Sequence, residues 1–232
     1  MYRNIVFKLF YVLSLLTVSI AVFDQSSVIF VKPFVIILLC CIYFIDNHKK
    51  NYLIPFSLLL IGVAEVFSVL DFSKYFNVLN IILTVYYIIN LMVLRKSLIV
   101  IKIKLKKILT GQLIISMILI GYVLYAVTNL ILPYTFFGVN IYLYVLLFFF
   151  LVFIGVCFYI YLNSKTIVSS SLMVAASCFL IVNITMALNE MYINIAVFPL
   201  IINLLQIIGQ FFLVKFYKDQ DKLTPDGDYF VS

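Results

Sequence analysis

The sequence predicts an all-α membrane protein, a polytopic bundle of eight transmembrane helices, from its composition and its long apolar runs. Of the 232 residues, 66% are hydrophobic and 11% are charged, whereas soluble domains carry roughly 25% charged residues. Apolar runs that can cross a hydrocarbon core of about 30 Å recur along the whole chain. They lack the alternation expected of barrel strands. Too little polar surface remains to cover a soluble core, so an integral membrane protein is predicted.

Eight apolar segments are predicted to span the membrane, because each is continuous and close to the ~20 residues that a spanning helix needs. In chain order these segments are Phe7–Phe23, Val28–Ile45, Tyr52–Leu70, Tyr75–Leu94, Ile108–Leu132, Phe136–Leu162, Ile167–Leu188 and Ile193–Phe216. Residues 1–217 are therefore predicted to form a single domain. Residues 218–232 contain Pro, Gly and four Asp, and are predicted to be a short, mobile cytoplasmic tail.

The distribution of Lys and Arg predicts the orientation of the bundle. With eight spans and a cytoplasmic N-terminus, fourteen of the 16 basic side chains lie on the cytoplasmic side, and only Lys32 and Lys74 lie outside. Both termini are then cytoplasmic. The alternative for the first segment is a cleavable signal peptide, because Arg3 and Lys8 accompany its apolar run and Ser19–Ala21 resembles a cleavage site. Such a cleavage would disturb the charge asymmetry.

The positions of the cysteine, histidine and basic residues argue against disulfides, metal sites and nucleic-acid binding. All four cysteines lie within predicted spans, and the sole histidine, His48, lies in a short basic loop, so neither a disulfide framework nor a metal site is predicted. No cofactor is expected. The connection Arg95–Lys107 alternates aliphatic residues with lysines, which favours contact with anionic lipid headgroups over binding to nucleic acid.

Polar side chains recur at helical spacing on several segments, and in lipid such stripes mark the faces that pack inside a bundle. In chain order the stripes are Gly62, Glu65 and Ser68; Asn80, Thr84 and Tyr87; Tyr122, Tyr125 and Asn129; Ala176, Asn183 and Ala187; and Pro199, Asn203, Gln206 and Gln210. For any single Asn or Gln in these stripes, an interhelical hydrogen bond of about 0.6 kcal/mol is favoured over a functional role.

Glu65 is harder to explain by packing, because a carboxylate inside a membrane is expensive and is by default a functional residue. With the predicted topology, Glu65 and Asn183 each lie five residues from the outer end of a span, about 7–8 Å deep. Asn203 enters from the same side, and Lys32 lies near the outer surface. A polar chamber in the outer half of the bundle is therefore predicted.

Several motifs together resemble the YhhN/TMEM86 family of lysoplasmalogenases. They are VKPFVIILL in the second segment, LIGVAEVFSVL in the third, TVYYI in the fourth, CFLIVNITMALNEM in the seventh and PLIINLLQIIGQFFLV in the eighth. The resemblance covers nearly the whole chain. It implies hydrolysis of the vinyl-ether bond of a lysoplasmalogen without a cofactor, a reaction that suits an acid that protonates carbon and a second group that positions water.

The resemblance assigns roles to particular residues and also exposes departures. Glu65 stands near the position of one family aspartate, and Asn183 stands at the other, so these two are the expected catalytic residues of a site that has lost one carboxylate. Thr84 occupies a histidine-like position. The expected substrate-binding residues are Lys32, which would attract the lipid phosphate, with Tyr87, Asn203, Gln206 and Gln210.

Two other functions are compatible with the same residues. A degenerate relative would hold a lysolipid or other amphiphile without cleaving it, and a small transporter would use the polar stripes as a path. A transporter is the weaker interpretation, because one intramembrane carboxylate and no visible inverted repeat leave little for ion coupling. Short loops and the basic cytoplasmic side favour a bacterial inner membrane. The oligomeric state is left open by the sequence.

Overall fold

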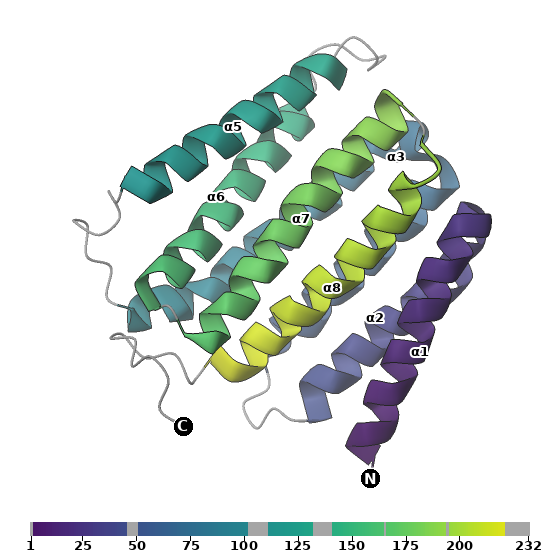
Figure 1. Ribbon diagram of the computed structural model, residues 1–232, viewed down its shortest axis with the longest axis horizontal. Helices are drawn as coiled ribbons and strands as arrows, with labels where there is room; N and C mark the ends of the chain where they lie inside the picture. The colour runs from purple at the N-terminus through teal and green to yellow at the C-terminus, as the bar shows by residue number, and fades with distance from the viewer. Residues whose placement is uncertain are drawn as a thin grey trace.

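The computed structural model describes residues 2–45, 51–101, 111–131, 141–164, 166–193 and 195–220. Across these ranges the chain forms helices and no strands (Figure 1). In order they are α1 (Tyr2–Phe23), the short 3₁₀ helix η1 (Gln25–Ser27), α2 (Val28–Ile45), α3 (Leu53–Val100), α5 (Gly111–Ile131), α6 (Ile141–Ser164), α7 (Ile167–Met191) and α8 (Phe198–Asp219).

Helix α3 consists of two arms that meet at a break. Its 48 residues would extend about 72 Å if they were straight, more than twice the hydrocarbon thickness of a bilayer. Asp71 interrupts it with extended backbone angles, φ −168° and ψ 95°. The Asp71 carboxylate accepts a hydrogen bond from the Lys74 amide at 2.9 Å, which caps the second arm. Residues of both arms line one pocket, so the chain folds back at Asp71.

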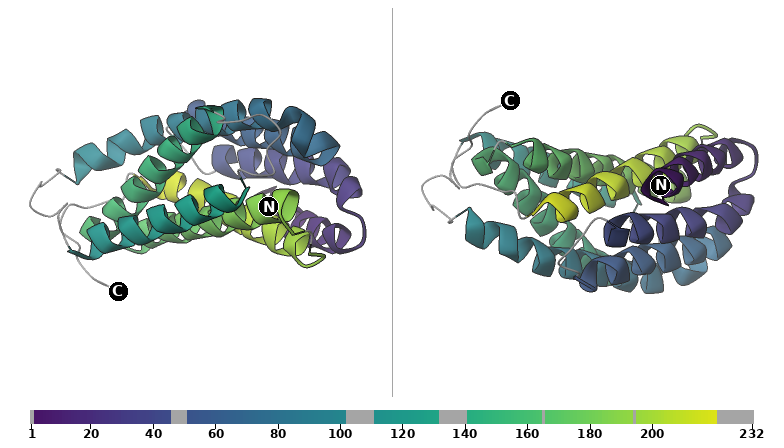
Figure 2. Two further views of the ribbon diagram at one scale, coloured as in Figure 1. Left: turned by 90° about the horizontal axis from the view of Figure 1, so that it is seen from above. Right: turned by 90° about the horizontal axis from the view of Figure 1, so that it is seen from below.

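The helices are arranged in two layers (Figure 2). Helices α2 and α3 form one layer, while α1, α7 and α8 form the other, and α6 packs against both α3 and α7. The α7–α8 contact is especially close at Gly209, where an added Cβ would lie 2.9 Å from the Phe179 ring. Small side chains at such a crossing let two backbones approach and gain van der Waals contact without a hydrophobic driving force.

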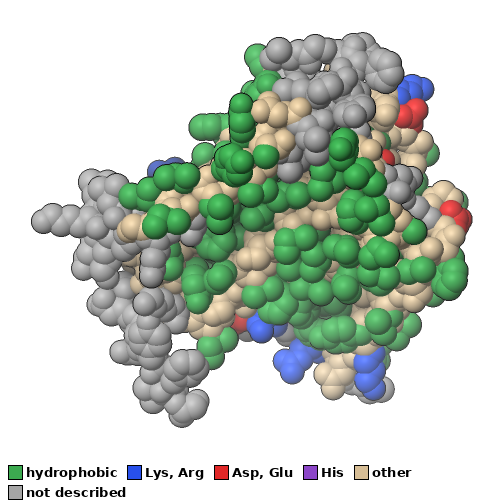
Figure 3. All heavy atoms as spheres, turned by 45° about the horizontal axis from the view of Figure 1, so that its top comes forward, with side chains coloured by type: hydrophobic (Ala, Val, Ile, Leu, Met, Phe, Trp, Pro, Cys, Tyr) green, Lys and Arg blue, Asp and Glu red, His purple; other side chains and the backbone are tan. Residues whose placement is uncertain are grey.

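Large apolar side chains cover the outside of the bundle. Leu15, Phe30 and Ile115 are 69%, 73% and 67% exposed, and Figure 3 shows hydrophobic side chains spread over the visible face. Within the described ranges, α1, α2, α3, α6, α7 and α8 are long and apolar enough to cross a membrane. A soluble protein does not leave so much apolar surface in water. The chain is an integral, multi-pass membrane protein.

Several predicted boundaries differ from the structure by a turn or more. The third and fourth predicted segments are joined in α3, whose second arm continues to Val100 and so includes the start of the predicted Arg95–Lys107 connection. Residues 102–110 lie outside the described ranges. Helix α8 continues to Asp219, two residues into the predicted tail, and the predicted mobility of residues 221–232 likewise falls outside the described ranges.

One predicted interior stripe is wrong. Tyr122 and Tyr125 of α5 are 67% and 65% exposed, and Asn129 is also exposed, so this stripe faces outward. Helical spacing shows that the three side chains share a face, but it does not show which face is buried.

Candidate functional site

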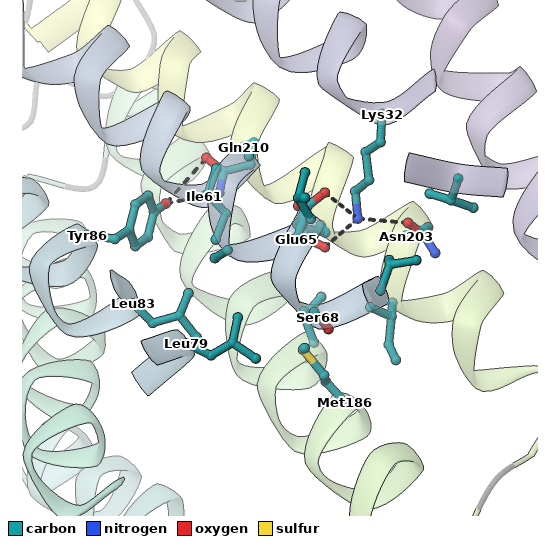
Figure 4. A pocket seen from close by; sticks show the side chains of 18 of the residues that line it. Lys32, Ile61, Glu65, Ser68, Leu79, Leu83, Tyr86, Met186, Asn203 and Gln210 are labelled. Carbon is teal, nitrogen blue, oxygen red and sulfur yellow. Dashed lines mark hydrogen bonds and ion pairs between the residues drawn. The ribbon is translucent and has the colours of Figure 1, made fainter. Parts of the chain in front are cut away.

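A buried lysine organises the polar centre of the bundle. The Lys32 ammonium of α2 lies 2.9 Å from Glu65 Oε2 on the first arm of α3, and the two side chains are 9% and 15% exposed. Lys32 also donates hydrogen bonds to Asn203 Oδ1 at 2.7 Å and to Gln206 Oε1 at 2.8 Å, both on α8. Figure 4 shows these contacts converging on one nitrogen. We call these four residues the Lys32 cluster.

The Lys32 cluster pairs opposite charges and contains two hydrogen bonds. The Lys32 ammonium donates to Asn203 and Gln206 on α8 and forms an ion pair with Glu65 on α3, whose Oε2 has no hydrogen-bond partner among the described residues. The Asn203 amide is itself held in place, because its Nδ2 donates to the Pro199 carbonyl at 2.8 Å. A buried charge is less costly when an opposite charge lies beside it. The ion pair with Lys32 therefore explains how Glu65 is retained in an apolar segment.

The Lys32 cluster forms one wall of a pocket with a volume of about 80 Å³. This polar pocket, as we call it, has room for several water molecules, since one water needs roughly 10–15 Å³. All seven residues expected to be catalytic or substrate-binding line it: Lys32, Glu65, Tyr87, Asn183, Asn203, Gln206 and Gln210. The structure thus brings together residues from four helices, although their proposed roles stay predictions.

Asn183 reaches the same pocket from α7. Its Nδ2 donates hydrogen bonds to Tyr87 Oη at 3.0 Å and to the Phe179 carbonyl at 2.7 Å. The second bond is to the residue four positions earlier in its own helix, and it fixes the amide against α7. With its N–H groups so engaged, the amide oxygen is the part of Asn183 that is left to receive a hydrogen bond from water or a ligand.

A ladder of hydrogen bonds continues from the pocket along the second arm of α3 and α8. Gln210 Nε2 donates to Tyr86 Oη at 3.1 Å, at the edge of the pocket. Tyr217 Oη then donates to Asn90 Oδ1 at 2.7 Å. These bonds fit the interpretation of polar stripes as interhelical contacts. Gln210 therefore serves packing as well as lining the pocket.

Glu190 is a pocket residue that the sequence analysis missed. It lies near the end of α7 and lines the polar pocket, so Glu65 is accompanied by a second carboxylate. Its Oε1 accepts a hydrogen bond from Asn189 Nδ2 at 3.0 Å. The signal was present in the sequence, because Glu190 follows Asn183 by seven residues, about two helical turns, and so shares its face. Its position near a helix end makes it resemble an ordinary interfacial charge.

Some predicted features lie elsewhere. Thr84, at the histidine-like position, donates to its own helix at the Asn80 carbonyl and does not line the polar pocket. Among the described residues, no three His, Cys, Asp or Glu side chains gather in a metal-binding arrangement. The Lys32 ammonium, expected to meet a lipid phosphate, instead contacts Glu65, Asn203 and Gln206 within the protein. A phosphate would have to displace one of these acceptors.

Comparison of the chain with protein-family models, with curated proteins and with solved structures found no match.

Proposed function

We propose that the protein is a membrane hydrolase that opens the vinyl-ether bond of a lysoplasmalogen, giving a fatty aldehyde and a glycerophospho-alcohol. The observation that carries the proposal is the polar pocket, which two carboxylates, Glu65 and Glu190, and the Asn183 amide all line. Its volume of about 80 Å³ gives water access to the groups that the reaction needs. The motif resemblance described above suggests the same substrate class.

The first step is protonation of the vinyl-ether β-carbon by Glu65. Lys32, 2.9 Å from the carboxylate, can pass a proton to it and turn the ion pair into a neutral pair. A low-dielectric site favours this exchange because separated charges are poorly solvated there. Transfer of that proton to carbon leaves an oxocarbenium ion on the substrate. The Glu65 carboxylate, now negative, stabilises this cation by its proximity.

The second step is the addition of water to the α-carbon. Glu190 accepts the proton that the water loses, and the Asn183 amide oxygen orients that water through a hydrogen bond. The product is a hemiacetal. Glu65 then accepts the hemiacetal hydroxyl proton as the C–O bond to glycerol breaks, and Glu190 returns its proton to the departing oxygen. Glu65 finally passes its proton back to Lys32, which restores the ion pair, and the net reaction consumes one water.

The proposal is tested with purified protein in detergent, a 1-alkenyl lysophosphatidylethanolamine and ¹⁸O-labelled water. Mass spectrometry is expected to find fatty aldehyde that carries ¹⁸O, because water supplies the carbonyl oxygen. Glu65→Gln and Glu190→Gln should each slow aldehyde release by about 10²-fold or more, the usual loss for a general acid or base. A 1-O-alkyl lysolipid, which has no double bond to protonate, should yield no aldehyde.

The control variant is Asp24→Asn, which removes an exposed carboxylate that lies in the connection between α1 and α2 and does not line the polar pocket. It should retain the wild-type rate. Absence of aldehyde with wild-type protein excludes this reaction for the lipid tested. A wild-type rate in the Glu65→Gln variant excludes Glu65 as the acid even if aldehyde forms.

A second candidate is a protein that binds the amphiphile without cleaving it. The Lys32–Glu65 ion pair favours this candidate, because a structural partner explains the retention of Glu65 without any catalytic role. Asn183 also favours binding without cleavage, because its amide cannot accept a proton from water as a carboxylate would. Lysolipid that co-purifies with wild-type protein, without aldehyde formation, would distinguish binding from hydrolysis. A transporter remains the third possibility, tested by flux into liposomes.

The topology is also proposed in finer detail than the helices themselves establish. We infer eight spans, with the two arms of α3 crossing separately and both termini in the cytoplasm. The fold-back at Asp71, which divides α3 into two arms, supports this arrangement. A bacterial inner membrane is the proposed location, and the Arg95–Lys107 segment is proposed to contact anionic headgroups, where each Lys or Arg contributes about 1 kcal/mol.

A further inference from the structure

A second cavity lies beside the polar pocket and has a different chemical character. Its volume is about 100 Å³, and it is lined by residues of the second arm of α3, α5, α6 and α7. We call it the apolar chamber. Aromatic and aliphatic side chains form most of its wall: Phe72, Phe76, Leu83, Leu124, Leu143, Leu146, Leu147, Phe150, Ile184, Met186 and Ala187. Only Asn80 and Asn183 bring polar side chains to it.

The apolar chamber and the polar pocket are neighbours that share part of one wall. Leu83, Asn183 and Met186 line both cavities, and Figure 4 shows Leu83 and Met186 at the edge of the polar pocket. An occupant with a polar part and a hydrocarbon part could therefore reach both spaces by passing these three side chains. Asn183 stands at the junction, which is the place where the linkage between the two parts would lie.

Asn80 is the unexplained group in the apolar chamber. The residue is 4% exposed, and its Nδ2 has no hydrogen-bond partner among the described residues. A buried amide N–H without an acceptor is costly, and such groups are rare unless a ligand or water completes them. Asn80 lies three residues before Leu83, so the donor is within one helical turn of the shared wall.

We propose that the apolar chamber binds a segment of the hydrocarbon tail of a single-chain amphiphile, and that Asn80 Nδ2 donates a hydrogen bond to an oxygen at the head end of that tail. An ester, ether or carbonyl oxygen provides the acceptor, and the bound carbons lie against Phe72, Phe76 and Phe150. The inference rests on the proposed amphiphile substrate, but it requires binding alone and no chemical step.

The absence of tryptophan from the chain makes a direct test possible, since a single introduced tryptophan becomes the only such fluorophore. Phe76→Trp places the probe at the apolar chamber, and Phe148→Trp places it on α6 at a side chain that is 61% exposed on the outer surface. Each protein is titrated in detergent with 1-(9,10-dibromostearoyl) lysophosphatidylethanolamine, whose bromines quench nearby indole. Saturable quenching of the Phe76→Trp protein, reversed by the unbrominated lipid, is expected.

Quenching of the Phe148→Trp protein should instead rise without saturation as brominated lipid enters the micelle. If both proteins show the same non-saturable curve, the apolar chamber holds no specific tail and the inference is overturned. The result is independent of cleavage, because the brominated lipid is an ester and has no vinyl-ether bond to open. Saturable quenching, with no aldehyde from the 1-alkenyl lipid in the hydrolase assay, would support the chamber and reject the hydrolase. Aldehyde from the 1-alkenyl lipid without saturable quenching would support the hydrolase and reject the chamber.

The role of Asn80 is tested in the Phe76→Trp background. Asn80→Leu keeps a similar size but removes the donor. It should raise the half-saturating lipid concentration by about tenfold, the effect of losing one hydrogen bond. Asn163→Leu is the matched control, because Asn163 donates to the Tyr159 carbonyl of its own helix and lines neither cavity. If Asn80→Leu fails to fold, Asn80→Ala replaces it. An unchanged half-saturation in a folded Asn80 variant overturns the assigned contact.

Discussion

Lys32 is the residue on which the polar interior depends, because it connects three helices through one atom. Its ammonium contacts Glu65 on α3 and the Asn203 and Gln206 amides on α8. Replacing Lys32 therefore removes three contacts between helices. Replacing both partners of a buried ion pair with apolar residues often leaves the stability of a protein unchanged. Removing only one partner destabilises the protein strongly, because the other charge stays buried and unpaired. The contribution of the pair is therefore visible only when single and double variants are compared.

Lys32→Met should destabilise the protein by about 3–5 kcal/mol, because the Glu65 carboxylate is left without its counter-charge. The double variant Lys32→Met/Glu65→Leu should recover much of that loss. Both are measured as the thermal midpoint of the protein in detergent, by intrinsic fluorescence or by loss of the gel-filtration peak. The control is Lys74→Met, which removes an exposed lysine. Equal loss in the single and double variants would contradict the pairing argument.

At the scale of the element, Asp71 converts one long apolar run into two antiparallel arms. Its carboxylate caps the second arm through the Lys74 amide, while its own backbone is extended. The first amides of a helix have no acceptor within the helix itself, so a capping side chain must supply one. Asp71 does this for the Lys74 amide. The fold-back places Leu83 and Tyr86 of the second arm opposite the first.

Asp71→Ala is expected to cost about 1 kcal/mol through loss of the cap, a fall of roughly 2–4 °C in thermal midpoint for a chain of this size. Asp71→Asn keeps an acceptor and should stay close to wild type. The two variants are compared by thermal melting in the same detergent. If Asp71→Asn falls as far as Asp71→Ala, the negative charge rather than the cap stabilises the turn.

The α7–α8 contact offers a second prediction at this scale. Gly209→Ala adds a methyl group 2.9 Å from the Phe179 ring and 3.1 Å from Cys178 Cβ, which overpacks the crossing and should destabilise by about 1–3 kcal/mol. Gly121→Ala on α5 is the matched control, since its Cβ would meet nothing within 4 Å among the described residues. A thermal melt that ranks the two equally would show that α8 can shift to accommodate the methyl.

At the scale of the whole molecule, the proposed even number of crossings makes a prediction about topology. A fluorescent protein fused after Ser232 should fold and fluoresce in bacterial cells, because the C-terminus is proposed to be cytoplasmic. Alkaline phosphatase fused after Asp24, in the connection between α1 and α2, should be active because that connection is proposed to be external. The reciprocal fusions serve as controls. An active phosphatase at Ser232 would reject the eight-span arrangement.

Much of the site was predictable because of the physics of lipid. A carboxylate and a lysine are expensive in hydrocarbon, so Glu65 and Lys32 stood out from the sequence and were expected in one chamber. Helical periodicity then added Asn203, Gln206 and Gln210. The same reasoning failed for Tyr122 and Tyr125, because periodicity gives a shared face without its direction. It also overlooked Glu190, whose place near a helix end resembles ordinary surface charge.

The sequence alone determined that this chain is a helical membrane protein and which of its side chains are too polar to face lipid. Hydrophobicity and helical spacing are local properties, so both can be obtained from the amino-acid sequence alone. Only the tertiary structure decided that Lys32 contacts Glu65, Asn203 and Gln206. It alone also placed an apolar chamber beside the polar pocket, with an Asn80 donor that has no partner among the described residues. Those facts depend on how helices far apart in the chain are rotated and packed, because hydrogen-bond partners and cavities exist only between surfaces that meet.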